Sequence, residues 1–428
     1  MPDIQAFRAW RYNPAKAKDL AAVFAPPYDV ISRSQQEALY RASPRNVIRL
    51  ELGKEITGDS DGTNKYTRAA QTLNDWKSSQ ALIREKSPAI YVCMQDYRED
   101  GKKRTRLGFF AAMKADEKAV LKHENTLKGP KEDRLALLKA VRTNLSPIWG
   151  LFEDKKGSVQ TALKKALAGK PIVDVTIDAV RHRLYVETRP DVIASIEKAM
   201  KPKPMFIADG HHRFEVACQF KDWMSAKAEE AASGKGWDRV MTYFSDCVHN
   251  PFKIFPTHRL LKLGSDIDAL RAVRGLGELD RIGSLAAVLK RLEKNRSETK
   301  DKKYSFGLYS KKNGFYIFTL NKKCSSRVKQ NPVDKLDVSV LHRFLIEPCY
   351  HIRSIEKSEA IDFTRDPREA VQKVNQGEFD LVLFLRPTSL EEMLAASKKG
   401  LKMPQKSTYF YPKLLTGLVF YSFEDAGS

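Results

Sequence analysis

Short apolar runs of strand type alternate with amphipathic helical segments along the chain of 428 residues, and this alternation restricts the folds open to it. The strand-type runs lie at 4–12, 46–52, 147–152, 171–178, 181–188, 205–209, 240–248, 378–387 and 414–423. The helical segments lie at 34–42, 65–80, 129–144, 158–168, 211–232 and 389–399. Since helices and strands are intermixed and no repeat is visible, the sequence predicts a mixed α+β fold.

Two further segments, 89–113 and 304–320, are typical of β-hairpins. Asp100-Gly101 and Asn313-Gly314 stand between their apolar halves. Both dipeptides accept the positive φ angles of a type I′ turn, so we expect this turn type in both hairpins.

The composition favours a globular protein of the cytoplasm. The first residues lack the apolar core of a secretory signal, and apolar runs such as 381–385 are far too short to cross a bilayer. The five cysteines form no Cys-x-x-Cys pair and are odd in number, which fits free thiols in a reducing compartment. We therefore expect no membrane partner.

The net charge of +22 favours anionic partners, either nucleic acid or phosphorylated small molecules. Residues 290–329 carry thirteen Lys or Arg against three Asp or Glu. A solvated surface explains this excess, and a nucleic-acid-binding module is the alternative. Six aromatic residues in the segment could stack on bases: Tyr304, Phe306, Tyr309, Phe315, Tyr316 and Phe318. However, they alternate as hairpin core residues do, and no helix-turn-helix is visible, so nucleic acid is the less favoured partner.

Several familiar catalytic motifs are missing from the sequence. Residues 406–408 lack the glycines of a phosphate-binding P-loop, and 275–280 lacks the third glycine of a dinucleotide fingerprint. Neither a His-Glu-x-x-His zinc motif nor a nucleophile elbow occurs.

The stretch FIADGHHRF (206–214) places Asp, Gly, two His and Arg where a strand is expected to pass into a helix. A helix N-terminus presents unsatisfied N–H groups and a partial positive charge. Gly210 removes the Cβ that would block a ligand, and His211, His212 and Arg213 add donors. Cations disfavour a first helical turn unless an anion binds there, so the pattern favours an anion site.

Asp209 could hold a hydrated Mg²⁺ against that anion. A transition-metal site of Asp209, His211 and Glu215 is an alternative, although neighbouring histidines point about 100° apart on a helix and the ligand spacing is unfamiliar. Ordinary polarity at the start of a helix is the third interpretation.

The segment ADGHHRFEVA (208–217) resembles the Asp-Gly-His-His-Arg box of the free-serine kinases in the ParB/sulfiredoxin-like superfamily. That resemblance implies a box at a helix N-terminus that handles nucleotide phosphate. It also implies a catalytic Glu upstream, followed by a helix and a strand beginning Pro-Ile, which His123-Glu124-Asn125-Thr126, 129–144 and Pro147-Ile148 match.

The whole chain is similar to a prokaryotic family of unknown function, domain-of-unknown-function family 1015. Its shared motifs are APPYDVI (25–31), NVIRLE (46–51), HENTLKGPKEDRL (123–135), ADGHHR (208–213), PTHR (256–259) and MPQKSTYFYPK (403–413). The two resemblances imply a ParB/sulfiredoxin-like mixed core with large N- and C-terminal α/β additions. We expect an N-terminal α/β segment at 1–88, a phosphate-binding core at 89–250 with an insertion near 153–200, and a C-terminal segment at 251–428 packing on the core.

The resemblance implies a phosphotransferase that uses Mg²⁺ and either ATP or ADP, with free L-serine or phosphoserine as its small-molecule substrate. Glu124 would orient or deprotonate the acceptor hydroxyl, unless it is a helix-capping residue. Asp209 would act with it and hold Mg²⁺, while Gly210, His211, His212 and Arg213 would bind phosphate. A phosphoserine phosphatase with water as acceptor, and a nucleotide-gated or nucleic-acid-binding module, are the alternatives.

Further candidate contacts stand in the other shared motifs. The loop 403–413 offers Lys406, Ser407, Thr408 and Lys413 as a second phosphate clamp, or is a solvated loop. Candidate substrate contacts are Tyr28, Asp29, Thr126, His258 and Arg259. A turning or core role is the alternative for 26–29 and for 257–259.

Overall fold

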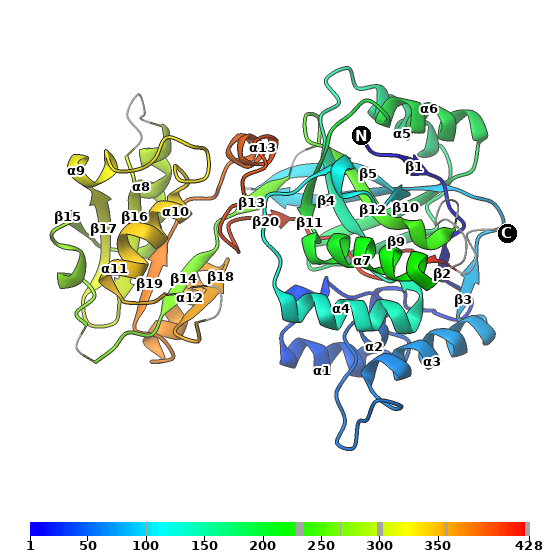
Figure 1. Cartoon of the computed structure of the whole chain (residues 1–428), viewed down its shortest axis with the longest axis horizontal. Coiled ribbons are helices and arrows are strands. Elements are labelled where there is room, and N and C mark those ends of the chain that lie inside the picture. Colours follow the sequence, from blue (N-terminus) through cyan, green and yellow to red (C-terminus); the bar gives the residue numbers. More distant parts are fainter. Residues whose placement is uncertain are drawn as a thin grey trace. The chain divides into compact units, whose positions relative to one another are not determined.

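The computed structural model describes residues 1–99, 101–227, 235–250, 252–265, 267–297, 303–353, 355 and 358–423. The chain forms two compact units (Figure 1). The first unit comprises 1–122, 126–253 and 412–428, and the second comprises 123–125 and 254–411. The chain therefore enters the second unit for only three residues at 123–125, and the predicted division at 88 and 250 stays a prediction.

The first unit is built on a nine-stranded sheet with the order β6-β11-β8-β12-β5-β4-β10-β9 and β1 beside β5. Its strands are β1 (Ile4–Gln5), β4 (Ile90–Glu99), β5 (Lys102–Lys114), β6 (Val120–Leu121), β8 (Ile148–Phe152), β9 (Val173–Ile177), β10 (Val180–Glu187), β11 (Met205–Asp209) and β12 (Arg239–Asp246). The pairs β6/β11 and β8/β12 are parallel, and the other pairs are antiparallel.

Helices cover this sheet, and α4 lies between α7 and α3 (Figure 1). The helices are α1 (Arg33–Ala42), α2 (Ile48–Glu51), α3 (Lys65–Ser78), α4 (Lys128–Val141), α5 (Ser158–Ala166), α6 (Pro190–Met200) and α7 (His211–Lys227). The unit also contains two-stranded sheets. In one, β2 (Trp10–Tyr12) pairs with β3 (Leu82–Arg84), and in another, β7 (Thr143–Asn144) pairs with β21 (Tyr421–Ser422). Apolar side chains of α5, α6 and α7 join those of the sheet in one buried core, for example Leu163, Ile196, Phe214 and Phe109.

The second unit contains a six-stranded sheet, β15-β17-β16-β19-β14-β18. Its strands are β14 (His258–Leu261), β15 (Gly277–Ile282), β16 (Ser305–Ser310), β17 (Gly314–Leu320), β18 (Ile361–Thr364) and β19 (Leu381–Phe384), and β13 (Lys253–Phe255) pairs with β20 (Tyr409–Tyr411). The helices are α8 (Leu285–Ser297), α9 (Lys322–Ser325), α10 (Asp337–Leu341), α11 (Glu347–Cys349), α12 (Pro367–Asn375) and α13 (Leu390–Lys398), with a π-helical turn at His342–Ile346. A separate apolar core joins α8 and α12 to the sheet through residues such as Val288, Val374 and Phe384.

Short 3₁₀ turns complete the backbone at Ala21–Val23, Tyr28–Val30, Glu117–Ala119, Gly236–Asp238 and Arg271–Val273. Among the described residues, no helix is long and apolar enough to cross a bilayer.

The predicted mixed α+β architecture is confirmed. Each predicted helix between residues 34 and 168 is present, and local chemistry explains where the first two begin. The Ser32 hydroxyl accepts from the Gln35 N–H while the Gln35 side chain accepts from the Ser32 N–H, which forms a capping box before α1. Asn64 caps α3 by accepting from Tyr66 and Thr67.

Three strand predictions are wrong in whole or in part. Residues 46–52 contain helix α2 rather than a strand, and the Asn46 side chain accepts from the Ile48 N–H while donating to the carbonyl groups of Ala22 and Phe24. A short apolar run that is buried on all sides has the same sequence pattern whether it forms a helix or a strand. The run 4–12 breaks into β1 and β2, and only Tyr421–Ser422 of 414–423 is a strand.

Both hairpins are present. The turn of β16–β17 differs from the prediction, whereas the turn type of β4–β5 stays a prediction. In β16–β17, Ser310 pairs with Gly314 across a three-residue loop. Gly314 has a φ of +78° whereas Asn313 has no positive φ, so the turn ends in a left-handed glycine and is not type I′. In β4–β5, Gly101 has a φ of +77°, and Asp100 lies outside the described residues.

The aromatic residues of the basic segment mostly serve the second unit's core. Phe306 and Phe318 are fully buried, Tyr304 is nearly so, and the rings of Tyr309 and Phe315 pack against each other with centroids 4.3 Å apart. Buried rings cannot stack on bases, so Tyr304, Phe306 and Phe318 are not available for nucleic-acid binding. Residues 298–302 lie outside the described part.

Substitution of Gly108 tests the packing of the central sheet. A Cβ at this position in β5 would lie 2.4 Å from the Phe244 carbonyl oxygen of the neighbouring β12. We expect Gly108→Ala to destabilise the protein by about 1–3 kcal/mol, visible as a lower melting temperature in scanning calorimetry. The control is Gly129→Ala in α4, where a Cβ meets nothing within 4 Å. This variant should melt no lower than wild type, because alanine favours the helix.

Candidate functional site

The Asp-Gly-His-His-Arg stretch lies at a strand–helix junction, as the sequence predicts. Strand β11 ends at Asp209, Gly210 has a φ of +90°, and α7 begins at His211. A Cβ at Gly210 would lie 3.1 Å from three atoms of the Arg213 guanidinium. The glycine therefore makes room for this side chain as well as permitting the left-handed backbone. This geometry disfavours the prediction that Gly210 clears space for a ligand.

The Asp209 carboxylate binds two cationic side chains. Arg213 Nη2 donates to Oδ2 at 2.9 Å, and Lys413 Nζ lies 2.6 Å from Oδ1. Arg213 Nη1 also donates to the Pro147 carbonyl oxygen, which precedes β8. The side chains of Asp209, Arg213 and Lys413 are only 16%, 11% and 14% exposed, so water screens these charge-assisted contacts weakly. We call these three residues the Asp209 cluster.

Magnesium does not fit Asp209 in this arrangement. Each carboxylate oxygen already accepts from a cation, and a divalent ion there would face both positive charges at close range. The role of Asp209 as a magnesium ligand stays a prediction, and this geometry disfavours it.

Residues Tyr28 and Asp29 lie close enough to the Asp209 cluster to act on Arg213. Burial opposes the charge of Arg213, but Asp209, then Asp29 and Tyr28, hold the pKa of Arg213 above its ordinary value. Burial, followed by the charge of Asp29, raises the pKa of Tyr28 to about 12, so its phenol stays protonated. Asp29 itself is exposed. The structure thus brings two predicted substrate-contact residues to the predicted anion site.

His212 does not provide the positive charge in the first turn that the sequence suggests. His212 Nε2 accepts a hydrogen bond from the Leu127 N–H at 2.9 Å, so this nitrogen carries no proton. The bond ties α7 to the start of α4, because Leu127 directly precedes that helix. His211 is buried, with 4% of its surface exposed. In the first turn of α7, Arg213 is the residue with a fixed positive charge, and it is paired.

Glu215 lies one turn further along α7. It contacts residues on both sides of the segment 123–125, which belongs to the second unit. Its carboxylate lies 3.2 Å from Lys122 Nζ, 3.3 Å from Lys131 Nζ and 2.5 Å from Thr126 Oγ1. Burial works in the opposite direction, but the Thr126 hydrogen bond and Lys122 lower the pKa of Glu215. Thr126 therefore serves as an anchor for residues 123–125. A transition-metal site with Glu215 as ligand is disfavoured, because cations already occupy its carboxylate.

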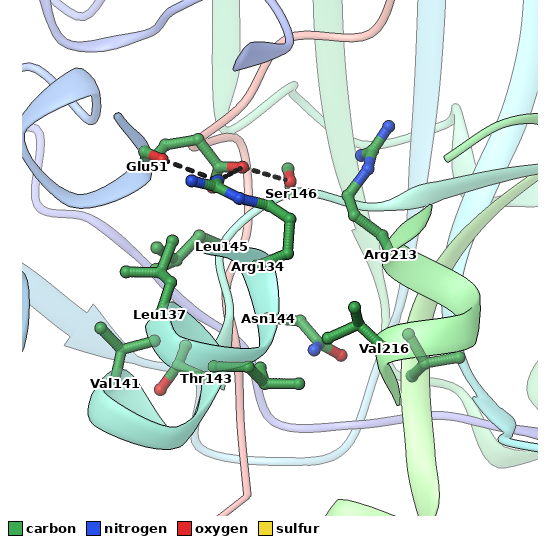
Figure 2. A pocket seen from close by; sticks show the side chains of 12 residues that line it. Glu51, Arg134, Leu137, Val141, Thr143, Asn144, Leu145, Ser146, Arg213 and Val216 are labelled. Atoms are coloured by element: carbon green, nitrogen blue, oxygen red, sulfur yellow. Dashed lines mark hydrogen bonds and ion pairs between the residues drawn. The ribbon is translucent and has the colours of Figure 1, made fainter. Parts of the chain in front are cut away.

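A second buried charge cluster next to Arg213 was not singled out from the sequence. Arg134 in α4 donates to the carbonyl and carboxylate oxygens of Glu51 at 2.8 and 3.3 Å, and to Asp133 at 2.6 and 2.9 Å. Its guanidinium lies 4.3 Å from the centre of the Tyr28 ring. Figure 2 shows Arg134 directed at Glu51, with Ser146 donating to the same carboxylate at 2.9 Å.

Glu51, Arg134 and Ser146 form a polar part of the wall of a pocket in the first unit (Figure 2). Arg213, Thr143 and Asn144 line the same pocket, and apolar side chains form the rest of its wall: Leu137, Leu138, Val141, Leu145, Val216 and Val240. The signal that could have revealed the second cluster is its membership in shared motifs. Glu51 ends NVIRLE, and Asp133 and Arg134 belong to HENTLKGPKEDRL.

In the second unit, residues 123–125 run beside the loop 403–408. The Met403 N–H donates to the His123 carbonyl oxygen at 2.7 Å, and Gln405 Nε2 donates to that of Asn125 at 3.2 Å. The Lys406 N–H lies 3.5 Å from Glu124 Oε1, a long contact. Glu124 does not cap α4, whose N-cap is Leu127. The structure thus pairs the predicted catalytic segment with the predicted clamp loop.

Only part of the clamp loop is available to a ligand. Lys406 is exposed and has a φ of +54°. The Ser407 hydroxyl is buried and donates to the Pro404 carbonyl oxygen, while Thr408 Oγ1 lies 3.5 Å from His123 Nε2. Lys413 belongs to the first unit, as part of the Asp209 cluster. The loop therefore divides its predicted phosphate contacts between the two units.

His258 and Arg259 are buried beneath this loop rather than exposed to solvent. His258 Nδ1 accepts from the Leu385 N–H at 3.3 Å, and burial lowers the pKa of His258 to about 3. Burial also lowers the pKa of Arg259 to about 9; Arg259 donates to His342 Nε2 at 3.3 Å and to the Gln405 carbonyl oxygen at 3.5 Å. This geometry favours a role in fixing the loop rather than a direct contact with substrate.

The predicted site residues thus form two groups, one in each unit. The first unit holds Tyr28, Asp29, Thr126, Asp209, Gly210, His211, His212, Arg213 and Lys413, and the second holds Glu124, His258, Arg259, Lys406, Ser407 and Thr408. Each group gathers residues from several shared motifs. Joint action of the two groups in one reaction stays a prediction.

A family model described as "Protein of unknown function (DUF1015)" matches residues 4–339. The chain belongs to this family. The match includes Asp209 and Arg213 of the Asp209 cluster and also Glu124, and it ends before the loop 403–408 and Lys413. No curated protein is significantly similar to the chain.

Several solved structures show weak likeness to this DUF1015 protein. A conserved hypothetical protein from Pyrococcus furiosus is 14% identical with a TM-score of 0.36, covering 74% of this chain and 97% of its own. A free serine kinase in complex with AMP is 12% identical with a TM-score of 0.35, covering 71% and 86%. SbnI with a C-terminal truncation, from Staphylococcus aureus, is 11% identical with a TM-score of 0.34, covering 72% and 85%. TM-scores this low establish neither a shared fold nor an activity, so the relation to the ParB/sulfiredoxin-like superfamily stays a prediction.

Removing the charge of Asp209 should destabilise the first unit. In Asp209→Asn, the ammonium of Lys413 and the guanidinium of Arg213 lose their carboxylate while they remain mostly buried. We expect a loss of about 1.5–3 kcal/mol and a lower melting temperature in calorimetry. The matched control is Asp174→Asn, which breaks a two-bond pair with the exposed Arg181. It should change the melting temperature little, because exposed ion pairs contribute little. Equal losses in both variants would contradict the assigned role of Asp209.

Buried histidines should make the protein sensitive to acid. Burial lowers the pKa of His258 from near 6.5 to about 3 and that of His342 to about 2. Below pH 6.5, these two histidines therefore bind protons in the unfolded chain but stay neutral in the folded chain. This stability is fully present above pH 6.5 and is lost as the pH falls toward the folded values, at about 1.4 kcal/mol per pH unit for each imidazole. Denaturant titrations from pH 7 to 5 should show this slope. In His342→Gln, whose amide oxygen can still accept from Arg259, the slope should be shallower; an unchanged slope would contradict the prediction.

Proposed function

We propose that this protein is a phosphotransferase that moves a phosphoryl group between a nucleotide and the hydroxyl of a small compound, with free L-serine or phosphoserine as the most suitable substrate. One observation carries the proposal: the shared motifs bring Arg213 and Lys413 together at the junction of β11 and α7, mostly buried and matched by a single carboxylate. Two cations held by one carboxylate leave a net positive charge, which suits the binding of phosphate.

Arg213 and Lys413 are the residues assigned to the nucleotide phosphates. Phosphoryl transfer depends mainly on positioning and on cations that stabilise the charge of the phosphoryl group. Asp209 keeps both cations in place and neutralises part of their charge before phosphate binds. Either ATP or ADP could be the phosphate donor. AMP is the nucleotide in the complex of the free serine kinase described above, and it is not assigned to this protein. Magnesium would arrive with the nucleotide, and no residue of this chain is assigned to it.

Glu124 is assigned to the acceptor hydroxyl, which it would orient or deprotonate. The resemblance to free-serine kinases suggests this role. The covalent chain adds support, because Glu124 is two residues from Thr126 and the two Cα atoms therefore lie within about 7 Å of each other. Thr126 in turn donates to Glu215 in the helix that begins at the Asp209 junction. The exposed carboxylate of Asp29 is suited to the ammonium group of a free amino acid.

A paired assay with the full chain tests the proposal. The protein is incubated with Mg²⁺, L-serine and either ATP or ADP, and phosphoserine is measured by mass spectrometry. We expect phosphoserine with one of the nucleotides. Glu124→Gln should lower the rate by about 10²–10⁴-fold, the usual contribution of a general base. Glu132→Gln, which alters an exposed carboxylate of α4 in the same motif, is the matched control and should keep its activity.

The second arm of the assay separates a kinase from a phosphatase. With water as acceptor, the same residues could hydrolyse phosphoserine, so phosphoserine alone is incubated with the protein and inorganic phosphate is measured. Release of phosphate without a nucleotide would replace transfer by hydrolysis. If neither arm exceeds its Glu124→Gln background, the proposed chemistry is wrong for these substrates.

A further inference from the structure

Arg106 is a fully buried cation in the middle of the first unit's sheet. It lies on β5 and none of its surface is exposed. Within the described residues its partners are neutral: Nε donates to Gln95 Oε1 at 2.9 Å, Nη2 contacts the same oxygen, and Nη2 donates to the Pro412 carbonyl oxygen at 2.7 Å. The rings of Trp149 and Tyr243 face the guanidinium, with centroids 4.0 and 5.7 Å away.

A charge buried in this way is costly. Burial without a carboxylate disfavours the charged form, and it lowers the pKa of Arg106. An apolar side chain of similar volume often stabilises a core as well as or better than a buried ion does. The charge at this position therefore calls for an explanation other than core packing.

Gln95 on the neighbouring β4 completes the arrangement. Its Oε1 receives the Arg106 donors, and its Nε2 donates to the Lys413 carbonyl oxygen at 3.0 Å. Nε2 also lies 3.3 Å from His182 Nδ1 on the adjacent β10. Arg106 and Gln95, which we call the fork, therefore hold the carbonyl groups of two successive residues, Pro412 and Lys413.

Those two residues stand where the chain returns to the first unit. Proline fixes its own φ, and the fork fixes the two carbonyl groups, so little backbone freedom remains at Lys413. The Lys413 side chain starts from this fixed backbone and ends 2.6 Å from the Asp209 carboxylate. Long lysine side chains are otherwise expensive to hold in one position.

We propose that Arg106 and Gln95 are positioning residues that place the Lys413 ammonium in the Asp209 cluster. The link to catalysis rests on the proposed function, which assigns Lys413 to phosphate. The positional claim itself does not: the fork determines where Lys413 lies whether or not the protein transfers phosphate. A purely structural fork would stabilise the sheet but leave the environment of Lys413 unchanged.

Lysine reactivity tests the positional claim without any substrate. Wild-type full chain is treated with limiting acetic anhydride between pH 7 and 10, and acetylation at each lysine is measured by mass spectrometry. Lys203 is the internal control, because its ammonium lies 2.9 Å from the buried Asp154 in the same unit and is 15% exposed, much like Lys413. In wild type, both lysines should react more slowly than exposed lysines.

Two conservative variants then loosen the fork in different ways. Gln95→Glu keeps an acceptor for Arg106 but loses the donor to the Lys413 carbonyl oxygen, and Arg106→Lys keeps a positive charge but loses the planar, multiple-donor geometry. In each, the acetylation of Lys413 should rise several-fold and its pH profile should shift to lower pH, while Lys203 stays unchanged. Unchanged Lys413 overturns the proposal. Equal gains at both lysines mean general loosening and also overturn it.

The paired phosphotransfer assay adds a second reading of the same variants. If wild type is active, Gln95→Glu should raise the KM for the nucleotide more than it lowers kcat, because a displaced Lys413 weakens phosphate binding. If wild type is inactive while Lys413 reactivity still responds to the fork, the proposed function fails and the positional claim stands. The two failures are therefore distinguishable.

Discussion

The ion pairs of Asp209 are the contacts on which the first unit's candidate site depends. One carboxylate joins the end of β11 to the first turn of α7 through Arg213, and to the returning C-terminal segment through Lys413. Arg213 extends the connection to Pro147, ahead of β8. Because these groups are mostly buried, removing the carboxylate would leave both cations uncompensated in a medium of low polarity.

Two other buried charges of the first unit follow the same principle, and each connects segments that are distant in sequence. Arg134 connects α4 to Glu51, and Glu215 connects α7 to both flanks of residues 123–125. Arg106 differs from these residues, since its compensation comes from an amide, a carbonyl group and aromatic rings. Arg106 contacts Pro412, the residue before Lys413, and this contact supports a role for the fork beyond packing.

Helices with local signals could be predicted from the sequence, whereas short apolar segments could not. Ser32 and Asn64 cap α1 and α3 through bonds to residues only two or three positions away, so their effect is visible in the sequence. Residues 46–52 have one local bond of this kind, from the Ile48 N–H to the Asn46 side chain, but that side chain also donates to carbonyl groups more than twenty residues earlier. Likewise, the outward or inward position of His258 depends on strands that pair far along the chain.

The sequence by itself determined the junction at Asp209: an apolar strand, a glycine that tolerates positive φ, and a helix whose first turn holds Arg213. Each of these depends on neighbours within a few residues. Tertiary structure alone decided which charges meet. Lys413 reaches Asp209 across 204 positions of sequence, and Glu51 and Arg134 meet across 83. Ion-pair partners are set by how folded segments approach one another in space, and no local periodicity encodes that approach.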